Sequence, residues 1–146
     1  MTKIMVIDDS NTVRMAAQSV LSKAGYDVYT AEDGFSAMST VNDHHPDLIF
    51  IDIIMPRLDG YQACALLKRN RKFREIPVVM LSSKDGLFDR ARGRIVGAED
   101  HINKPFSKED LLNAVFRYAG VPNKVDQGSI IPALEMSVEE FSDEDY

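Results

Sequence analysis

Continuous apolar runs are the feature that most constrains the fold of this chain. Residues 4–7, 48–51 and 78–81 are apolar without interruption. An unbroken apolar strand has both faces buried, which is typical of central strands in a parallel sheet covered by helices on both sides. Residues 27–30 alternate more and predict an edge strand, and residues 101–103 predict a short last strand. The runs therefore favour an α/β protein.

Helical patterns separate these strands. Residues 13–24 follow the i, i+3, i+4 rhythm of one buried stripe, and residues 111–119 form a second stripe. Weaker helices are predicted around residues 36–41 and 61–69. The remaining signals are an N-cap at Ser10, helix stops at Gly25, Gly97 and Gly120, a capping box from Ser107 to Asp110, and a four-residue repeat of Leu87, Ala91 and Ile95. Strand and helix thus alternate five times, which predicts a doubly wound five-stranded parallel sheet with right-handed crossovers.

Charge is unevenly distributed along the chain of 146 residues. Residues 1–121 carry 16 basic and 16 acidic side chains, whereas residues 122–146 carry one lysine and seven acids, which account for the whole net charge of −6. We therefore expect one domain over residues 1–121 and a flexible acidic tail over 122–146. A neutral body with an acidic tail does not suit a phosphate backbone, so nucleic-acid binding is not expected.

The sequence also indicates a cytoplasmic protein. No stretch approaches the ~20 apolar residues of a membrane-spanning helix, and the short first apolar run is not a secretory signal. Membrane insertion is therefore not expected. The single cysteine, Cys64, cannot form an internal disulfide and reads as a small helix residue in a reducing compartment.

Polar groups follow the apolar runs at the strand ends. Because the carboxyl ends of parallel strands share one edge of a sheet, we expect these groups to converge. Three carboxylates at one edge repel each other unless a cation joins them, and Mg²⁺ prefers such oxygen ligands. A carboxylate can attack phosphorus, and a lysine can neutralise the transferred group. Singly, each group has an ordinary reading as a cap, turn or surface residue. Together they predict a magnesium and phosphoryl site made of Asp8, Asp9, Asp52, Ser82 and Lys104.

The motifs around these groups resemble the receiver domain of two-component response regulators. Residues 6–10 read VIDDS, residues 51–60 read IDIIMPRLDG, residues 81–83 read LSS and residues 104–106 read KPF. The resemblance covers residues 3 to about 119. It implies a flavodoxin-like fold with strand order 2-1-3-4-5.

The resemblance also implies individual roles. Asp52 is the expected phosphoacceptor, and Asp9 and Asp52 are expected to bind Mg²⁺ directly. Asp8 would act through a metal-bound water, and the Ile54 carbonyl would be a further ligand. The phosphate would be contacted by Lys104 and Ser82, with a cis bond between Lys104 and Pro105. Partners would read the surface of the fourth helix, fifth strand and fifth helix, and no external substrate is expected.

Three positions depart from the family pattern. His101 stands where the family has its switch aromatic, so we hypothesise a weaker or pH-dependent switch. Ile54 and Lys84 occupy the positions that tune hydrolysis in this family. Ile54 offers no polar group to a water molecule, which predicts slow self-dephosphorylation. Lys84 pairs with the phosphate or lies on the surface.

Two longer segments point to a pathway. Residues 55–68 and 80–97 closely resemble single-domain, chemotaxis-like receivers of type IV pilus twitching-motility systems. The resemblance implies a chemotaxis-type histidine kinase as phosphate donor and a pilus-motor protein or downstream regulator as output partner. Arginines at 90, 92 and 94, and a basic cluster over residues 68–74, are either solvated charged faces or docking patches for an acidic partner or the acidic tail.

Three rival functions fit the sequence less well. An aspartyl-nucleophile phosphatase needs a second carboxylate two residues after the nucleophile, where this chain has Ile54. A receiver-shaped interaction module that is never phosphorylated remains open, although the complete set of site residues argues against it. A flavin-binding fold needs a phosphate loop where this chain has Asp8 and Asp9.

Overall fold

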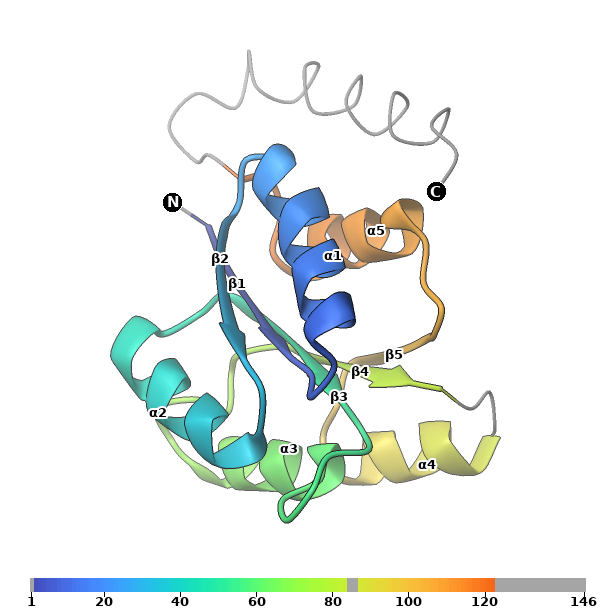
Figure 1. Ribbon diagram of the computed structural model, residues 1–146. Helices are drawn as coiled ribbons and strands as arrows, with labels where there is room; N and C mark the ends of the chain where they lie inside the picture. The colour runs from blue at the N-terminus through green and yellow to red at the C-terminus, as the bar shows by residue number, and fades with distance from the viewer. Residues whose placement is uncertain (1, 84–86, 123–146) are drawn as a thin grey trace.

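The computed structural model describes the backbone of residues 2–83 and 87–122 (Figure 1). Side chains are described for the same residues except 87–89. Strands and helices alternate without exception in this part of the chain. The strands are β1 Lys3–Ile7, β2 Asp27–Ala31, β3 Leu48–Asp52, β4 Val78–Ser82 and β5 Asp100–Asn103. The helices are α1 Asn11–Lys23, α2 Gly34–His44, α3 Gly60–Arg69, α4 Leu87–Ile95 and α5 Lys108–Tyr118. The fivefold alternation predicted from the sequence is confirmed.

The five strands form one parallel sheet in the order β2-β1-β3-β4-β5. This confirms the predicted flavodoxin-like topology and places β2 at an edge. The register aligns the strand ends, since Ile7 pairs with Ile51 and Ser82 pairs with Asn103. The residues that follow these positions therefore emerge side by side at one edge of the sheet.

Helices cover both faces of the sheet, which explains the unbroken apolar runs. Figure 1 shows α1 and α5 on one face and α2, α3 and α4 on the other. All five residues of β3 are buried. Leu48 and Phe50 pack towards α1 and α5, while Ile49 and Ile51 pack towards α2 and α3. Each such side chain stabilises the fold by about 1.5–3 kcal/mol.

The helix ends largely follow the predicted caps. The Ser10 hydroxyl accepts from the Val13 amide, and Ser107 forms the expected capping box with Asp110. Gly25, Gly97 and Gly120 follow α1, α4 and α5 with positive φ angles, as helix stops require. The predicted cis bond between Lys104 and Pro105 is present.

Two members of the apolar repeat predicted on α4, Ala91 and Ile95, do not face the sheet. Ala91 is exposed and Ile95 is 83% exposed, although α4 ends where predicted. Among the α4 residues whose side chains are described, the buried one is Gly93, where an added Cβ would lie 3.7 Å from the Met80 side chain. α4 therefore approaches β4 through a residue without a side chain, and its exposed side carries apolar and basic groups.

The last described residues are fixed against the start of the sheet. The Thr2 amide donates to Pro122 O at 3.1 Å, and the Thr2 hydroxyl donates to Val121 O at 2.9 Å. The Tyr26 hydroxyl donates to Gly120 O at 2.7 Å. The chain thus leaves the sheet at the edge opposite the strand carboxyl ends. The division of the chain at residues 121 and 122 stays a prediction.

Among the residues that the structure describes, no helix is both long and apolar enough to cross a membrane.

Candidate functional site

Three carboxylates meet at the carboxyl edge of the sheet. Asp8 follows β1, Asp9 begins the loop to α1, and Asp52 ends β3. One carboxylate oxygen from each lies within 4.8 Å of the others. Asp8 is fully buried and Asp52 is 5% exposed, whereas Asp9 is exposed. The predicted acidic cluster is therefore present, with one carboxylate open to solvent.

Lys104 places its ammonium between two of these carboxylates. Its Nζ lies 2.6 Å from Asp8 Oδ2 and 3.1 Å from Asp52 Oδ1. The backbone of Lys104 is held as well, because its amide donates to Ser82 O at 2.6 Å. Ser82 is 4% exposed and lies at the end of β4, beside β3. The structure thus brings together all five residues that the sequence assigned to this site.

Asp8 is held by contacts that the sequence reading missed. Its Oδ1 accepts from the Ser10 amide at 2.9 Å, and its carbonyl oxygen accepts from Arg14 Nη1 at 2.6 Å. Its amide donates to Ala31 O at 3.1 Å. Arg14 lies one helical turn into α1, and no local motif distinguishes it from a surface arginine. It positions the backbone of Asp8 through tertiary geometry alone.

The loop after Asp52 folds back closely on the end of β3. The Gly60 amide donates to Ile53 O at 2.8 Å, and the Ile53 amide donates to Leu81 O at 3.0 Å. A Cβ added at Gly60 would lie 2.3 Å from the Asp52 carbonyl oxygen. Only glycine fits this contact, so Gly60 sets the path of the loop that follows the central carboxylate.

Burial and neighbouring charges shift the titration of the site. Burial, together with the charge of Asp8, raises the pKa of Asp52 to about 6, although Lys104 opposes the shift. Burial alone would lower the pKa of Lys104, but its hydrogen bond to Asp8 and the charges of Asp52 and Asp8 raise it overall. When all three carboxylates are ionised, the single positive charge of Lys104 therefore does not balance the negative charge of the site.

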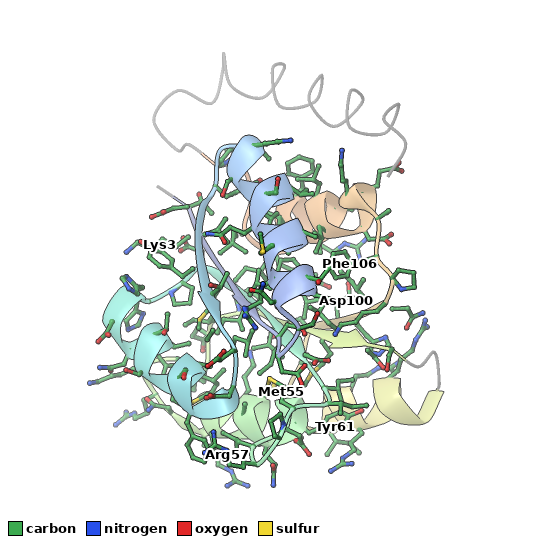
Figure 2. All side chains as sticks on the ribbon, viewed as in Figure 1. Lys3, Met55, Arg57, Tyr61, Asp100 and Phe106 are labelled. Atoms are coloured by element: carbon green, nitrogen blue, oxygen red, sulfur yellow. The ribbon has the colours of Figure 1, made fainter. Side chains whose placement is uncertain are left out.

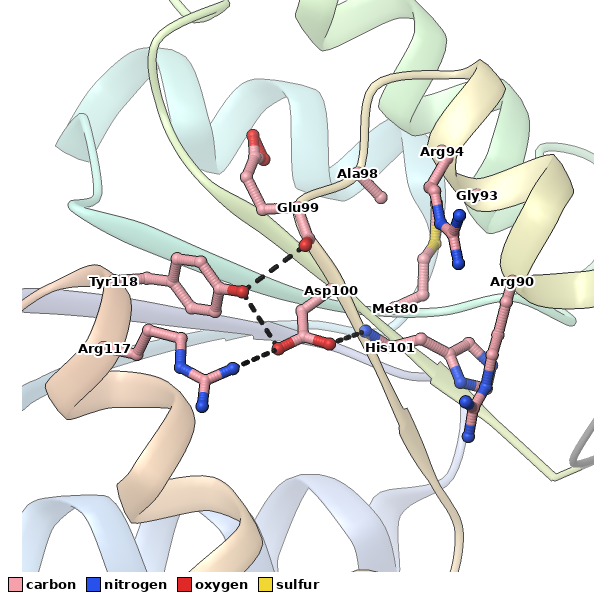
Figure 3. A pocket seen from close by; sticks show the side chains of 10 residues that line it. All are labelled: Met80, Arg90, Gly93, Arg94, Ala98, Glu99, Asp100, His101, Arg117 and Tyr118. Atoms are coloured by element: carbon pink, nitrogen blue, oxygen red, sulfur yellow. Dashed lines mark hydrogen bonds and ion pairs between the residues drawn. The ribbon is translucent and has the colours of Figure 1, made fainter.

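The other predicted residues lie around this centre rather than in it. Ile54 is 61% exposed, so an apolar side chain borders the opening beside Asp52. His101 is half-buried on β5 and, as Figure 3 shows, its ring lies beside Arg90 of α4. Lys84 lies outside the described residues.

Two arginines beside the site were not assigned a role there from the sequence. Arg57 lies 3.8 Å from Asp33 and 5.4 Å above the Phe35 ring, which ties the loop after β3 to the start of α2. Arg92 lies 4.3 Å above the ring of Tyr61. Figure 2 shows Tyr61 and Arg57 below the sheet, on the side covered by α2, α3 and α4.

A cavity of about 350 Å³ adjoins this arrangement. Its lining residues come from the loop after β3, the start of α3, the end of β4 and α4; they are Ile53, Ile54, Met55, Asp59, Tyr61, Ser82 and Arg92. Arg92 therefore lines the same cavity as Ser82, although the sequence assigned its helix to a surface patch. Lys68 does not belong to the exposed basic cluster predicted over residues 68–74. Its Nζ pairs with Glu99 Oε1 at 2.6 Å, and its side chain is largely buried.

The fold and this acidic centre define a class of protein. Residues 4–116 match the response regulator receiver domain, and the chain belongs to that family. It is a receiver domain of the chemotaxis-like kind.

Individual relatives agree with this assignment. The chain is 61% identical to Protein PilG of Pseudomonas aeruginosa over 113 residues, which cover 77% of this chain and 84% of PilG. It is 30% identical to the solved chemotaxis protein CheY4 of Vibrio cholerae, with a TM-score of 0.78 over 81% of this chain and 98% of that one. A probable transcriptional regulator, ycf27 of Porphyridium aerugineum, is 41% identical over 127 residues, which cover 87% of this chain but 50% of that protein.

Proposed function

We propose that this protein is a phosphorylation-dependent response regulator that accepts a phosphoryl group on Asp52. The observation that carries the proposal is the placement of Asp52, 5% exposed at a strand end, beside Asp8, Asp9 and Lys104. A nucleophilic oxygen needs nearby cationic charge to approach a phosphoryl group, and Lys104 supplies part of it. Partial burial of Asp52 also protects an acyl phosphate from bulk water.

The donor set fits Mg²⁺. All three side chains offer carboxylate oxygens, and the exposed Asp9 leaves room for the water molecules that Mg²⁺ retains. Asp9 and Asp52 would hold the ion directly, Asp8 through water, and the Ile54 carbonyl would complete the set. The bound ion would neutralise charge on the transferring group.

Lys104 and Ser82 then act on the product. Phosphorylation adds negative charge and acceptor oxygens at Asp52. The ammonium of Lys104 already lies 3.1 Å from Asp52 Oδ1, so a short movement lets it pair with a phosphate oxygen. Ser82 ends the neighbouring strand, and its hydroxyl can donate a hydrogen bond to a second phosphate oxygen. The reaction is self-modification, so the protein has no external substrate.

Acetyl phosphate tests the proposal. In the presence of Mg²⁺, intact-protein mass spectrometry is expected to show one added phosphoryl group on the wild type and none on Asp52→Asn. Asp43→Asn removes an exposed carboxylate of α2 and serves as the matched control. Equal phosphorylation of Asp52→Asn would overturn the assignment of the acceptor. No phosphorylation of any variant would favour the alternative of an unphosphorylated, receiver-shaped interaction module.

We further propose that the protein acts in the cytoplasm in type IV pilus twitching motility. The support is the resemblance of residues 55–68 and 80–97 to receivers of those systems, together with the identity to PilG. A chemotaxis-type histidine kinase would supply the phosphate, and a pilus-motor protein or downstream regulator would bind the surface of α4, β5 and α5. Expression in Pseudomonas aeruginosa lacking PilG is expected to restore twitching, whereas Asp52→Asn is not. Equal restoration by both would contradict control by phosphorylation.

His101 stays a proposed switch residue. Its ring lies between β5 and Arg90, so any inward movement after phosphorylation would change the contact of β5 with α4. We expect His101→Tyr to alter the phosphorylation-induced NMR shifts on α4, with a pH dependence only in the wild type. Identical shifts for the two proteins at several pH values would remove His101 from the switch.

A further inference from the structure

We propose that the acidic segment of residues 130–146 docks on the α4–β5–α5 face of its own chain. Here the docking face means the surface around the cavity bounded by α4, β5 and α5. This contact lies within one chain and does not depend on phosphorylation of Asp52.

The docking face is hollow and rich in arginine. Its cavity has a volume of about 530 Å³. Figure 3 shows Arg90 and Arg94 on the α4 side, Arg117 and Tyr118 on the α5 side, and β5 between them. A hollow of this volume can hold side chains of a peptide segment, and its cations favour an acidic one.

The carboxylates within the face are already engaged. Glu99 pairs with Lys68 at 2.6 Å and accepts from the Val78 amide at 3.1 Å. Asp100 accepts from the Tyr118 hydroxyl at 2.9 Å and lies 3.5 Å from Arg117. In contrast, no carboxylate in the described part of the chain pairs with Arg94. Its charge therefore remains available to a further anionic partner.

Exposed apolar side chains on α4 lie outside the cavity lining. Ile95 is 83% exposed at the end of α4, next to Arg94, and Ala91 is exposed one turn earlier. A partner with both acidic and apolar groups suits this surface, because Arg94 can bind a carboxylate while Ile95 is removed from water.

The C-terminal segment has this chemistry. Residues 135–145 contain six acids and no basic residue. The apolar residues Ile130 and Leu134 precede these acids, and Val138 and Phe141 lie among them. The segment therefore combines carboxylates with apolar side chains in its sequence, which complements Arg94 and Ile95.

The position of the last described residues brings this segment within reach. Arg117 and Tyr118 line the cavity, and the chain is held at Pro122 only four positions later. Residues 123–129 span at most about 25 Å when extended. A linker of this length gives a high effective concentration, so weak contacts are sufficient for docking. The basic cluster at residues 69–74 follows α3, does not line this cavity, and serves as the competing surface.

A spin label on the full chain tests the proposal. Ser142→Cys provides the labelling site, since the native Cys64 is fully buried and burial raises its pKa to about 11. At about 0.05 M salt we expect the label to broaden the amide signals of α4 and β5, and at about 0.5 M salt we expect recovery. Unlabelled wild-type protein treated in the same way controls for reaction at Cys64.

Two matched variants locate the docking site. Arg94→Glu is expected to abolish at least about half of the broadening, whereas Arg71→Glu, which reverses an exposed charge in the competing cluster, is expected to leave it unchanged. Circular dichroism verifies that both variants fold. The proposal is overturned by absent broadening, by broadening centred on residues 69–74, or by broadening in a mixture where label and isotope lie on different chains.

The phosphorylation-dependent output proposed above uses the same face, so a docked tail would compete with partners. Only this consequence rests on the proposed function. The labelling experiment contains no partner, kinase or phosphate donor, so its result stands independently.

Discussion

The ammonium of Lys104 lies 2.6 Å from Asp8 Oδ2 and thereby occupies the acidic centre as a cation of the chain itself. A divalent ion at the same carboxylates must share them with this charge. The ion pair therefore links metal binding, proton binding and the position of Lys104.

Removal of the Lys104 charge is expected to strengthen Mg²⁺ binding. In Lys104→Met at pH 8 the dissociation constant should fall by about three- to tenfold, because like-charge repulsion between the ammonium and the ion is lost. Isothermal titration calorimetry measures the change, with Lys23→Met at the end of α1 as control. Weaker Mg²⁺ binding by Lys104→Met would show that the lysine supports the metal site.

The Asp52 carboxyl makes stability dependent on pH. Its pKa is about 6 in the folded chain, against an ordinary value of 3.8, so the folded state binds the proton more tightly. This contribution to stability is fully present below pH 3.8 and is lost as the pH rises through 6. In EDTA at pH 7.5, Asp52→Asn should therefore be more stable than wild type by about 1–3 kcal/mol, with a smaller difference at pH 5.

Urea denaturation at the two pH values measures this effect. Asp43→Asn should stay within about 0.5 kcal/mol of wild type at both. Mg²⁺ should narrow the gap between wild type and Asp52→Asn, since the ion stabilises the ionised carboxylate. If Asp52→Asn raised the free energy of unfolding equally at pH 5 and at pH 7.5, this result would contradict a raised pKa of Asp52.

Gly60 and Gly93 are expected to respond oppositely to alanine. The added methyl group at Gly60 meets the Asp52 carbonyl oxygen at 2.3 Å, so Gly60→Ala should lower the free energy of unfolding by about 2–4 kcal/mol. At Gly93 the nearest atom lies 3.7 Å away, and alanine should stabilise helix α4 by about 0.5–1 kcal/mol. Denaturant titration of the two variants compares them directly, and equal effects would exclude a specific steric role for Gly60.

Lys68 should contribute far more to stability than its neighbour Arg74. Lys68 Nζ contacts Glu99 and donates to Ile76 O at 2.8 Å, so Lys68→Met removes the ion pair of Glu99 and the hydrogen bond to the Ile76 carbonyl. We expect a loss of about 1–2 kcal/mol in the free energy of unfolding, because the pair is partly exposed to solvent. Arg74 lies 4.0 Å from an exposed Glu75, and Arg74→Gln should change stability by less than about 0.5 kcal/mol. Similar losses in the two variants would contradict this difference.

The apolar Ile54 should slow hydrolysis of the phosphorylated protein. Its exposed side chain offers no hydrogen bond to an attacking water, and one such bond is worth about 1 kcal/mol. Ile54→Asn should therefore shorten the phosphate lifetime by about five- to tenfold. Leu66→Asn, an exposed change on α3, is the control, and decay is followed by mass spectrometry after removal of acetyl phosphate. A wild-type lifetime of only seconds would contradict slow self-dephosphorylation.

The sequence by itself determined the sheet and the members of the central site. Continuous apolar runs require burial on both faces, and the polar residues at their ends must then meet at one edge of a parallel sheet. Asp8, Asp9, Asp52, Ser82 and Lys104 were predicted for this reason. The caps at Ser10 and Ser107 followed from local chemistry.

Tertiary structure alone decided the contacts between distant elements. Arg14 and Arg92 look like ordinary helix arginines until folding places one on the Asp8 carbonyl and the other over Tyr61. The exposure of Ile95 follows from the packing of the Gly93 side of α4 against β4, which turns Ala91 and Ile95 away from the core. Periodicity identifies the elements because it depends on neighbours along the chain. It does not specify which side of a short helix faces the sheet, because that depends on the shapes of residues far apart in the sequence.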